Sequence, residues 1–248
     1  MAGVSGVSAV QTQPFGGKTY YYKKVLSYGP IAYWPLWEPS GAVAQCLVNP
    51  AQNGTHSGVT LGQQGIGDGR TCPYYDGAND HTNTYSVALD AAFNGAELSF
   101  VIWARVDAAA VWTDGIARLA IHFRVDADNR VYIGKDLVNN QLDFLYEAGN
   151  VLERVQYNIG APTSWLSLGI TASASAGVDG EVRAYVNGTQ VGATQTTLGV
   201  WAGALDATRV CIGAFNTAPT LVWSGWLGHG AVFNRALAPA EMAALAVV

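Results

Sequence analysis

Charged side chains are scarce in this sequence. Lysine, arginine, aspartate and glutamate make up 12% of the 248 residues, which is about half the usual share for soluble domains. The 13 basic and 18 acidic residues leave a net charge of −5, and this argues against a nucleic-acid-binding protein. Low charge with abundant alanine and glycine fits a surface partly covered by neighbouring subunits, although compositional drift in a GC-rich genome gives the same pattern.

Cysteines and long apolar runs are also few. The three cysteines, Cys46, Cys72 and Cys211, form neither a disulfide framework nor a Cys-x-x-Cys metal spacing. Cys211 lies in a strand pattern and is expected to be buried, whereas pairing of Cys46 with Cys72 stays open. No stretch reaches the roughly 20 apolar residues of a membrane span. The start of the chain also lacks the apolar run of a secretory signal.

What the sequence does contain is a series of strand patterns. Residues 97–107 alternate, with Phe100 and Ile102 on one face and Val101 and Trp103 on the other. Further strand patterns lie in 118–134, 141–149, 164–194, 208–216 and 221–234, and the turns in 164–194 contain Asp179-Gly180 and Asn187-Gly188. Only 237–245 predicts a helix, with Pro239 suited to its first position. Strands without intervening helices predict an antiparallel sandwich.

The charge is unevenly distributed along the chain. Residues 1–37 hold three lysines and no acid, whereas the other 211 residues carry 10 basic and 18 acidic side chains. A basic, tyrosine-rich segment on an acidic body predicts docking onto a neighbouring subunit, with a solvated tail as the alternative. We expect an assembly arm over residues 1–26 and one domain over 27–248. The residues expected to dock are Lys18, Tyr20, Tyr21, Tyr22, Lys23 and Lys24.

Six motifs in order resemble the laminin G-like domains of the concanavalin A-like jelly-roll superfamily, over residues 27–247. They are GPIAYWPLWEPSG, NPAQNGTHSGVTLGQQGIGDG, PYYDGANDHTNTYS, FVIWARV, SWLSLGITASASAGVDGEVRAYVNGTQVG and VFNRALAPAEMAAL. The resemblance implies an all-β, antiparallel two-sheet jelly-roll sandwich with one short C-terminal helix and an extended N-terminal arm. Trp34, Trp103 and Trp165 lie in strand patterns and are expected to pack in the core.

Relatives with this fold that hydrolyse polysaccharides place two carboxylates on one strand, in a Glu-x-Asp-x-x-Glu pattern. None of the six glutamates here is followed two positions later by aspartate. Asp143 and Glu147 share a strand pattern, but four residues along a strand span about 13 Å, which is too far for the standard mechanisms. We therefore expect no enzymatic activity and no catalytic residues.

Calcium is the one cofactor that the resemblance suggests. Asp76 and Asp80 occupy the positions of the family's Phe-Asp-Gly-x-x-Asp segment, and Asn79 lies beside them. The family's closing strand often supplies two further carboxylates, and here Gly228 and His229 stand at their positions. Asp76 and Asp80 also suit a simple turn stabilised by hydrogen bonds to the backbone.

Several aromatic residues fall near loops or strand ends, where an exposed ring could stack on a sugar. The same rings could instead cover the core or meet a neighbouring subunit. The candidate glycan-binding residues are Trp37, Tyr75, Trp112, Trp201, Trp223 and Trp226.

Three hypotheses follow from these observations. The first is a non-catalytic structural or adhesive subunit of a larger surface assembly, a phage capsid-decoration or tail protein, docked by its arm and displaying a glycan-binding face. The second is a stand-alone carbohydrate-binding module assisted by calcium. The third, least favoured, is a polysaccharide hydrolase. The expected location is a virion surface or the outside of a cell, and the expected partners are other subunits and polysaccharide.

Overall fold

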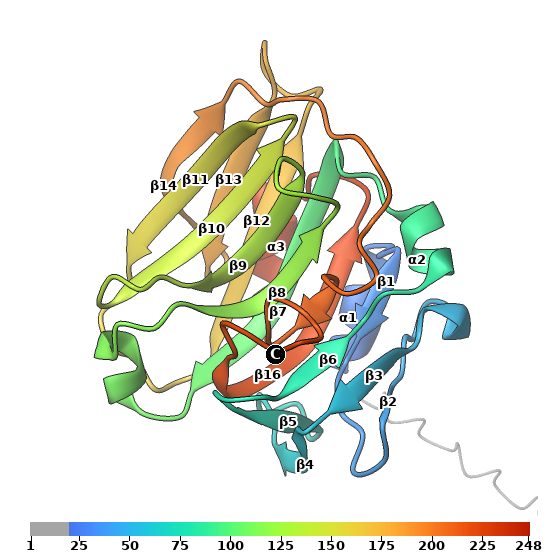
Figure 1. Ribbon diagram of the computed structural model, residues 1–248, viewed down its shortest axis with the longest axis vertical. Helices are drawn as coiled ribbons and strands as arrows, with labels where there is room; N and C mark the ends of the chain where they lie inside the picture. Colours follow the sequence, from blue (N-terminus) through green and yellow to red (C-terminus); the bar gives the residue numbers. More distant parts are fainter. Residues whose placement is uncertain (1–19) are drawn as a thin grey trace, which may run out of the picture.

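The computed structural model describes residues 20–248 as two stacked antiparallel sheets, A and B, each of eight strands. Sheet A runs in the order β14-β13-β12-β7-β16-β5-β4, with β1 paired to β16, and sheet B runs β11-β10-β9-β8-β15-β6-β3-β2. In Figure 1, strands β8 to β11 of sheet B lie in front of β7, β12 and β13 of sheet A. The prediction of an antiparallel jelly-roll sandwich is confirmed.

The strands and helices have the following bounds. Sheet A contains β1 (Ala32–Trp34), β4 (Thr60–Gln64), β5 (Thr71–Asp76), β7 (Glu97–Val106), β12 (Leu166–Ser173), β13 (Glu181–Val186), β14 (Thr189–Thr196) and β16 (Ser224–Phe233). Sheet B contains β2 (Val43–Ala44), β3 (Gly54–Ser57), β6 (His81–Asn83), β8 (Arg118–Arg124), β9 (Arg130–Lys135), β10 (Gln141–Ala148), β11 (Val151–Asn158) and β15 (Cys211–Ile212). The helices are α1 (Tyr21–Ser27), α2 (Val87–Ala92) and α3 (Pro239–Leu245), with short 3-10 turns η1 (Pro50–Gln52) and η2 (Ala109–Thr113).

The main core lies between the two sheets and follows the alternation of the strands. In β7, Phe100 and Ile102 point into this core, and both side chains are fully buried. The tight turn between β13 and β14 has positive φ angles at Asn187 (50°) and Gly188 (76°), as the Asn-Gly pair predicts. The predicted C-terminal helix is α3. Trp34 is buried in the main core, whereas Trp165 is only partly buried.

A second hydrophobic cluster covers part of the outer face of sheet A, where α1 and α3 pack over β7. Val101 and Trp103 therefore lie under helices, although the alternating pattern places them on the face opposite the core. The Tyr21 side chain of α1 is buried at the centre of this cluster. Its hydroxyl accepts a hydrogen bond from Trp103 Nε1 (2.8 Å) and donates one to the carbonyl oxygen of Leu245 in α3 (2.7 Å).

This packing corrects the expected role of one arm residue, Tyr21. Tyr21 is buried in its own domain, so it is not free to dock on another molecule, whereas Lys24 is partly exposed and donates to the carbonyl oxygen of Val247 (2.6 Å). The boundary expected after residue 26 falls inside α1, whose Tyr21 and Val25 side chains are both buried. Tyr21 and Val25 are four residues apart, so they lie on one face of a helix, and burial of this face attaches α1 to the domain.

The other arm residues have different positions. Tyr20 and Lys23 are exposed and Tyr22 is partly exposed, so docking through them stays a prediction. Lys18 lies outside the described residues.

A buried polar network lies beneath α1 and was not predicted. The Tyr33 hydroxyl is 2.6 Å from Nδ1 of His229, and Nε2 of His229 is 3.2 Å from Oδ2 of Asp68. His229 has a φ of 55° in a bulge of β16, between Gly228 and Ala231. Burial alone would raise the pKa of Asp68, but the hydrogen bond and charge of His229 bring it below its ordinary value. The network fixes the loop before β5 against sheet A.

All three cysteines are free and buried, so Cys46 and Cys72 do not form a disulfide bond. Burial raises the pKa of Cys72 and of Cys211 to about 12. These two thiols therefore stay protonated near neutral pH.

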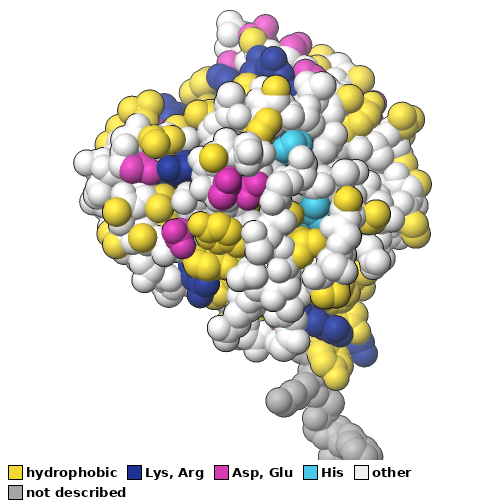
Figure 2. Space-filling model, turned by 60° about the horizontal axis from the view of Figure 1, so that its bottom comes forward, with side chains coloured by type: hydrophobic (Ala, Val, Ile, Leu, Met, Phe, Trp, Pro, Cys, Tyr) yellow, Lys and Arg dark blue, Asp and Glu magenta, His cyan; other side chains and the backbone are white. Residues whose placement is uncertain are grey.

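The surface agrees with the low charge of the sequence. Figure 2 shows one face on which charged side chains are sparse and hydrophobic side chains are scattered among uncharged ones. Among residues 20–248, no helix is long and apolar enough to cross a membrane.

Replacing Tyr21 by phenylalanine should lower the free energy of unfolding by about 1–3 kcal/mol, because the Trp103 Nε1 donor and the Leu245 carbonyl lose their shared partner while buried. Urea denaturation of Tyr21→Phe measures this loss. Tyr22→Phe is the matched control, since the Tyr22 hydroxyl has no hydrogen-bond partner within residues 20–248 and its side chain is partly exposed. Equal stability of the two variants would contradict a structural role for Tyr21.

Candidate functional site

The outer face of sheet B carries rows of polar side chains that run across β8, β9, β10 and β11. These side chains alternate with core residues, so they share one face because the strands pair in a fixed register. One row contains His122, Tyr132, Leu145 and Arg154, and the next contains Arg124, Arg130, Glu147 and Leu152. A third row lies on the other side of the row that contains Tyr132 and Arg154, and in it Asp143 stands between Gly134 and Gln156.

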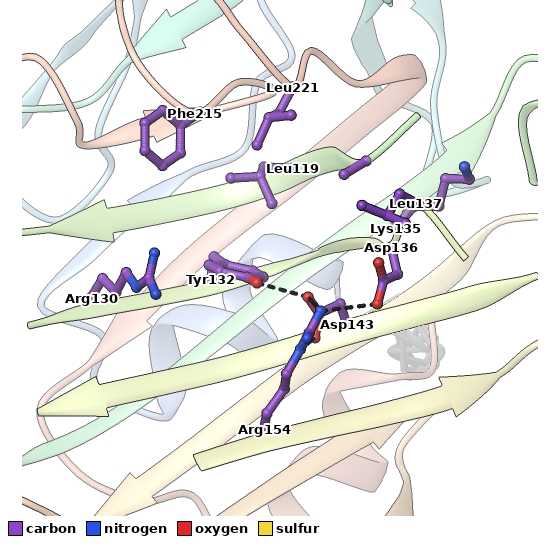
Figure 3. Close-up of a pocket in the computed structure, with 11 residues that line it drawn as sticks. Leu119, Arg130, Tyr132, Lys135, Asp136, Leu137, Asp143, Arg154, Phe215 and Leu221 are labelled. Carbon is purple, nitrogen blue, oxygen red and sulfur yellow. Dashed lines mark hydrogen bonds and ion pairs between the residues drawn. The ribbon is translucent and has the colours of Figure 1, made fainter. Parts of the chain in front are cut away.

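A pocket of about 200 Å³ opens on this face. Figure 3 shows its floor on β8, β9 and β10, with Phe215 and Leu221 of the loop before β16 on one side and Arg154 of β11 on the other. The side chains that line it are both apolar and charged: Ala117, Leu119, Arg130, Tyr132, Lys135, Asp136, Leu137, Asp143, Arg154, Phe215 and Leu221.

Arg154 organises the polar side of the pocket. Its guanidinium donates to both oxygens of Asp143 (2.7 Å each) and to Oδ2 of Asp136 (2.9 Å), as Figure 3 shows in part. Tyr132 donates its hydroxyl proton to Asp143 as well (2.7 Å). The hydrogen bond to Asp143 raises the pKa of Arg154, and burial together with the charge of Asp143 raises the pKa of Tyr132. The pocket therefore presents a fixed set of charged groups rather than mobile ones.

Phe215 forms the aromatic wall of the pocket and covers His122. The two rings stack with centroids 4.7 Å apart and planes 14° apart. Because a carbonyl oxygen only accepts, Nδ1 of His122 donates to the Phe215 carbonyl (2.8 Å), while its buried Nε2 has no partner within residues 20–248. Burial, with the nearby arginines, lowers the pKa of His122 to about 3. The imidazole under Phe215 is thus neutral at physiological pH.

The two carboxylates considered for catalysis, Asp143 and Glu147, both lie on the outer face of β10. Asp143 is held by Arg154 and Tyr132, and Oε2 of Glu147 accepts from Nε of Arg130 (2.6 Å). Both side chains are more than 90% buried. Each of these carboxylates therefore has a structural partner in place of a substrate atom.

The six predicted glycan-binding aromatics do not form one site, and none of them lines this pocket. Tyr75, Trp112 and Trp223 are buried, so the prediction that they offer exposed platforms is wrong. The sequence around these three residues resembles that of loops, so it did not indicate that their side chains are buried. The Tyr75 hydroxyl bonds Thr82 (2.8 Å) in the interior, and the indole nitrogens of the two tryptophans donate to backbone carbonyls (2.8 and 3.3 Å).

The other three aromatics are partly exposed and lie apart from one another. Trp37 packs against Tyr22 and under Arg70. Trp201 packs on Phe93 and Tyr146. These contacts stabilise local structure.

Trp226 belongs to an aromatic row on the outer face of sheet A. It lies next to Tyr74 (centroids 5.1 Å apart) and under the guanidinium of Arg105 (3.8 Å). These partly exposed rings form an aromatic surface on sheet A, apart from the pocket on sheet B.

Asp76 and Asp80, the candidate metal ligands, lie together in the turn after β5. Oδ1 of Asp76 accepts from the backbone nitrogens of Ala78 (2.8 Å) and Asn79 (3.2 Å), and Oδ2 of Asp80 accepts from the backbone nitrogen of Asp76 (2.8 Å). These bonds are the turn-forming role of the two aspartates. Among residues 20–248, no three histidine, cysteine or acidic side chains are grouped so that they could hold a metal ion.

Sequence reasoning missed the side chains that build the pocket. Arg130 and Tyr132 stand on β9 and Arg154 on β11, and only the pairing of both strands with β10 brings them together. The signal that was available is the polar alternation in residues 152–156, where Leu152, Arg154 and Gln156 share the face of Asp143 and Glu147.

The fold is that of an antiparallel jelly-roll β-sandwich, and comparison with known proteins agrees. A laminin G family model, described as the concanavalin A-like lectin/glucanases superfamily, matches residues 76–243. The chain belongs to this superfamily. A search of curated proteins gives no match.

Solved structures show the same fold at low sequence identity. Domain 4 of AbnA, an extracellular arabinanase from Geobacillus stearothermophilus solved with arabinotriose, is 13% identical with a TM-score of 0.60, over 88% of this chain and 98% of that one. The botulinum neurotoxin serotype D binding domain is 13% identical with a TM-score of 0.64, over 90% of this chain and 52% of that one. Trypanosoma rangeli sialidase is 12% identical with a TM-score of 0.61, over 87% of this chain and 32% of that one. The chain thus spans about half of the neurotoxin domain and a third of the sialidase.

Acid should destabilise the protein through His122. The unfolded imidazole, with an ordinary pKa of about 6.5, takes up a proton as the pH falls, whereas the buried one does not until about pH 3. The contribution of His122 to the free energy of unfolding is therefore fully present above about pH 6.5 and decreases as the pH falls towards 3. At pH 5 the free energy of unfolding is lower by about 2 kcal/mol because of this group. Denaturation of the wild type and His122→Gln at pH 7 and pH 5 measures the difference. An NMR titration in which His122 protonates near pH 6.5 would refute this prediction.

Proposed function

We propose that this protein is a non-catalytic jelly-roll domain that binds carbohydrate in the pocket on the outer face of sheet B. The observation that carries the proposal is the combination of an aromatic wall, Phe215, with two partly exposed guanidinium groups held by carboxylates, Arg130 and Arg154, in one recess. Sugars present apolar C–H faces and polar hydroxyls together, and such a recess matches both.

The size of the recess supports recognition of one sugar unit within a longer chain. Its volume of about 200 Å³ is below the roughly 300–1,000 Å³ of pockets for drug-sized ligands. The neighbouring rows of polar side chains extend the surface along the strands, where further units would lie. A related domain, domain 4 of the arabinanase AbnA, was solved with arabinotriose, which supports saccharide binding as a use of this fold.

The absence of catalysis is part of the proposal. Both carboxylates on β10 are held by arginines, and four residues along a strand separate them by about 13 Å. Retaining and inverting glycosidases place their carboxyl groups about 5–9.5 Å apart. A reducing-sugar assay on polysaccharides bound by the protein should therefore show no product.

Phe215→Ala should weaken binding of an oligosaccharide at least about tenfold, because it removes the aromatic wall of the pocket. A glycan array first identifies ligands of the wild type, and isothermal titration calorimetry then measures the variant. Trp226→Ala is the matched control, since it removes an aromatic side chain from the outer face of sheet A. Loss of binding only in Trp226→Ala would move the site to that face, and an array without any bound glycan would reject the function.

A second candidate function is that of a subunit in a larger surface assembly, such as a phage capsid-decoration or tail protein. The observation that favours it is an aromatic and basic cluster, made of Tyr20, Tyr22, Trp37 and Arg70, that remains partly exposed beside α1. Figure 2 shows hydrophobic and basic side chains together where the described chain begins. Aromatic residues with arginine are enriched in protein–protein interfaces. On a multivalent particle, weak contacts with glycans would add up.

Deleting residues 1–19 tests the assembly role. The shortened protein should stay folded, because α1 and its contacts with α3 remain, and it should lose self-association or particle binding. Sedimentation velocity and circular dichroism of the two forms measure both properties. The double variant Tyr20→Ser, Tyr22→Ser examines the described part of the same surface. Unchanged association in both proteins would contradict an assembly role for this end of the chain.

A further inference from the structure

Two arginines, Arg124 and Arg209, lie over the Phe215 ring, and a third, Arg130, lines the same pocket as this ring. Arg124 of β8 and Arg130 of β9 stand directly opposite each other in the strand pair. The guanidinium carbons of Arg124 and Arg209 lie 5.5 and 5.4 Å from the centre of the Phe215 ring. Because Arg130 and Phe215 also line the pocket, this arginine cluster of Arg124, Arg130 and Arg209 continues the same recess.

Each of the three side chains is oriented through its Nε and leaves its terminal nitrogens unused. Nε of Arg124 donates to the carbonyl of Asp126 (2.5 Å) and Nε of Arg130 to Glu147 (2.6 Å). Nε of Arg209 lies 3.3 Å from a carboxylate oxygen of Asp206. Within residues 20–248, the terminal nitrogens of these arginines have no hydrogen-bond partner, and Arg124 has no ion pair. The cluster therefore offers several N–H donors that have no acceptor within the described residues.

The positive charge of this cluster is only partly balanced, because Glu147 pairs with Arg130 and Asp206 with Arg209, whereas Arg124 has no ion pair within residues 20–248. Like charges directly opposite each other on paired strands destabilise a sheet. Burial, together with the charges of Arg209 and Arg130, lowers the pKa of Arg124. His122 beneath Phe215 is neutral and adds no charge. A bound anion would neutralise the repulsion and take up the free donors, and a planar carboxylate fits guanidinium groups in the bidentate manner.

We propose that the arginine cluster is an anion subsite that binds the carboxylate of an acidic sugar, and that the ligand of this domain is a uronic-acid-containing polysaccharide. This inference rests on the proposed function, because the neighbouring sugar ring of the same polysaccharide would occupy the pocket. It adds the chemical class of the ligand, which neither the fold nor the pocket specifies.

The test compares one oligosaccharide in two forms. A galacturonic acid trimer and its carboxyl-reduced galactose trimer differ only in charge and in the three carboxylates. Calorimetry should show the acidic form binding at least about tenfold more tightly at low salt, with the preference decreasing as salt rises. Arg124→Gln and Arg209→Gln should each remove most of this preference, with a much smaller effect on binding of the neutral trimer. Arg183→Gln is the matched control, because Arg183 lies on β13 in the other sheet.

The outcomes separate the inference from the function on which it rests. Equal binding of the two trimers, with both weakened by Phe215→Ala, would overturn the anion subsite and leave carbohydrate binding intact. Inorganic sulfate that binds as tightly as the acidic trimer would overturn the assignment to an acidic sugar. Absence of binding to either trimer and to every glycan of the array would reject both proposals.

Thermal unfolding gives a second measurement that needs no ligand. If the cluster is strained by its own charge, Arg124→Gln should raise the Tm by about 1–2 °C, because it relieves the repulsion with Arg130 and Arg209. Arg183→Gln should not raise it, since that arginine is paired with Glu181. A lower Tm for Arg124→Gln would mean that the guanidinium stabilises the free protein, and this would contradict the inference.

Discussion

The register between β8, β9, β10 and β11 is the constraint on which the site depends. In each strand every second side chain points into the core, so the side chains between them all face outward. A slip of one residue in β10 would bring Asp143 and Glu147 into the core and expose Phe144 and Tyr146. The core residues therefore hold the polar rows of sheet B in place, and the pocket is a consequence of the same packing that stabilises the sandwich.

The two sheets use their outer faces differently. On sheet A, α1 and α3 cover part of the face, and Tyr21 joins them to Trp103 through buried hydrogen bonds. On sheet B, the surface between Phe215 and Arg154 stays open as a recess. The fold thus devotes much of one outer face to stability and leaves the other available for a ligand. The predicted glycan-binding aromatics that are buried, Tyr75, Trp112 and Trp223, belong to neither outer face but to the core between the sheets.

Much of the fold could be predicted from the sequence, because local rules govern it. The Asn187-Gly188 turn and the alternation around Phe100 depend on neighbouring residues only. The pocket could not be predicted in the same way, since Arg130, Asp143 and Arg154 meet only after three strands pair. Burial of Trp112 and Trp223 was also missed, because a loop position in sequence does not show which side of the sandwich the loop covers. α1 was recoverable in principle, since Tyr21 and Val25 are spaced as one helical face.

The buried cysteines have a practical consequence. Cys72 and Cys211 are held as inert thiols inside the sandwich, and Cys46 is shielded as well. Oxidising surroundings therefore offer no route to crosslinked chains through these side chains while the domain is folded. A single cysteine introduced on the surface would react alone, so a spectroscopic reporter could be attached at any chosen position against a chemically silent background.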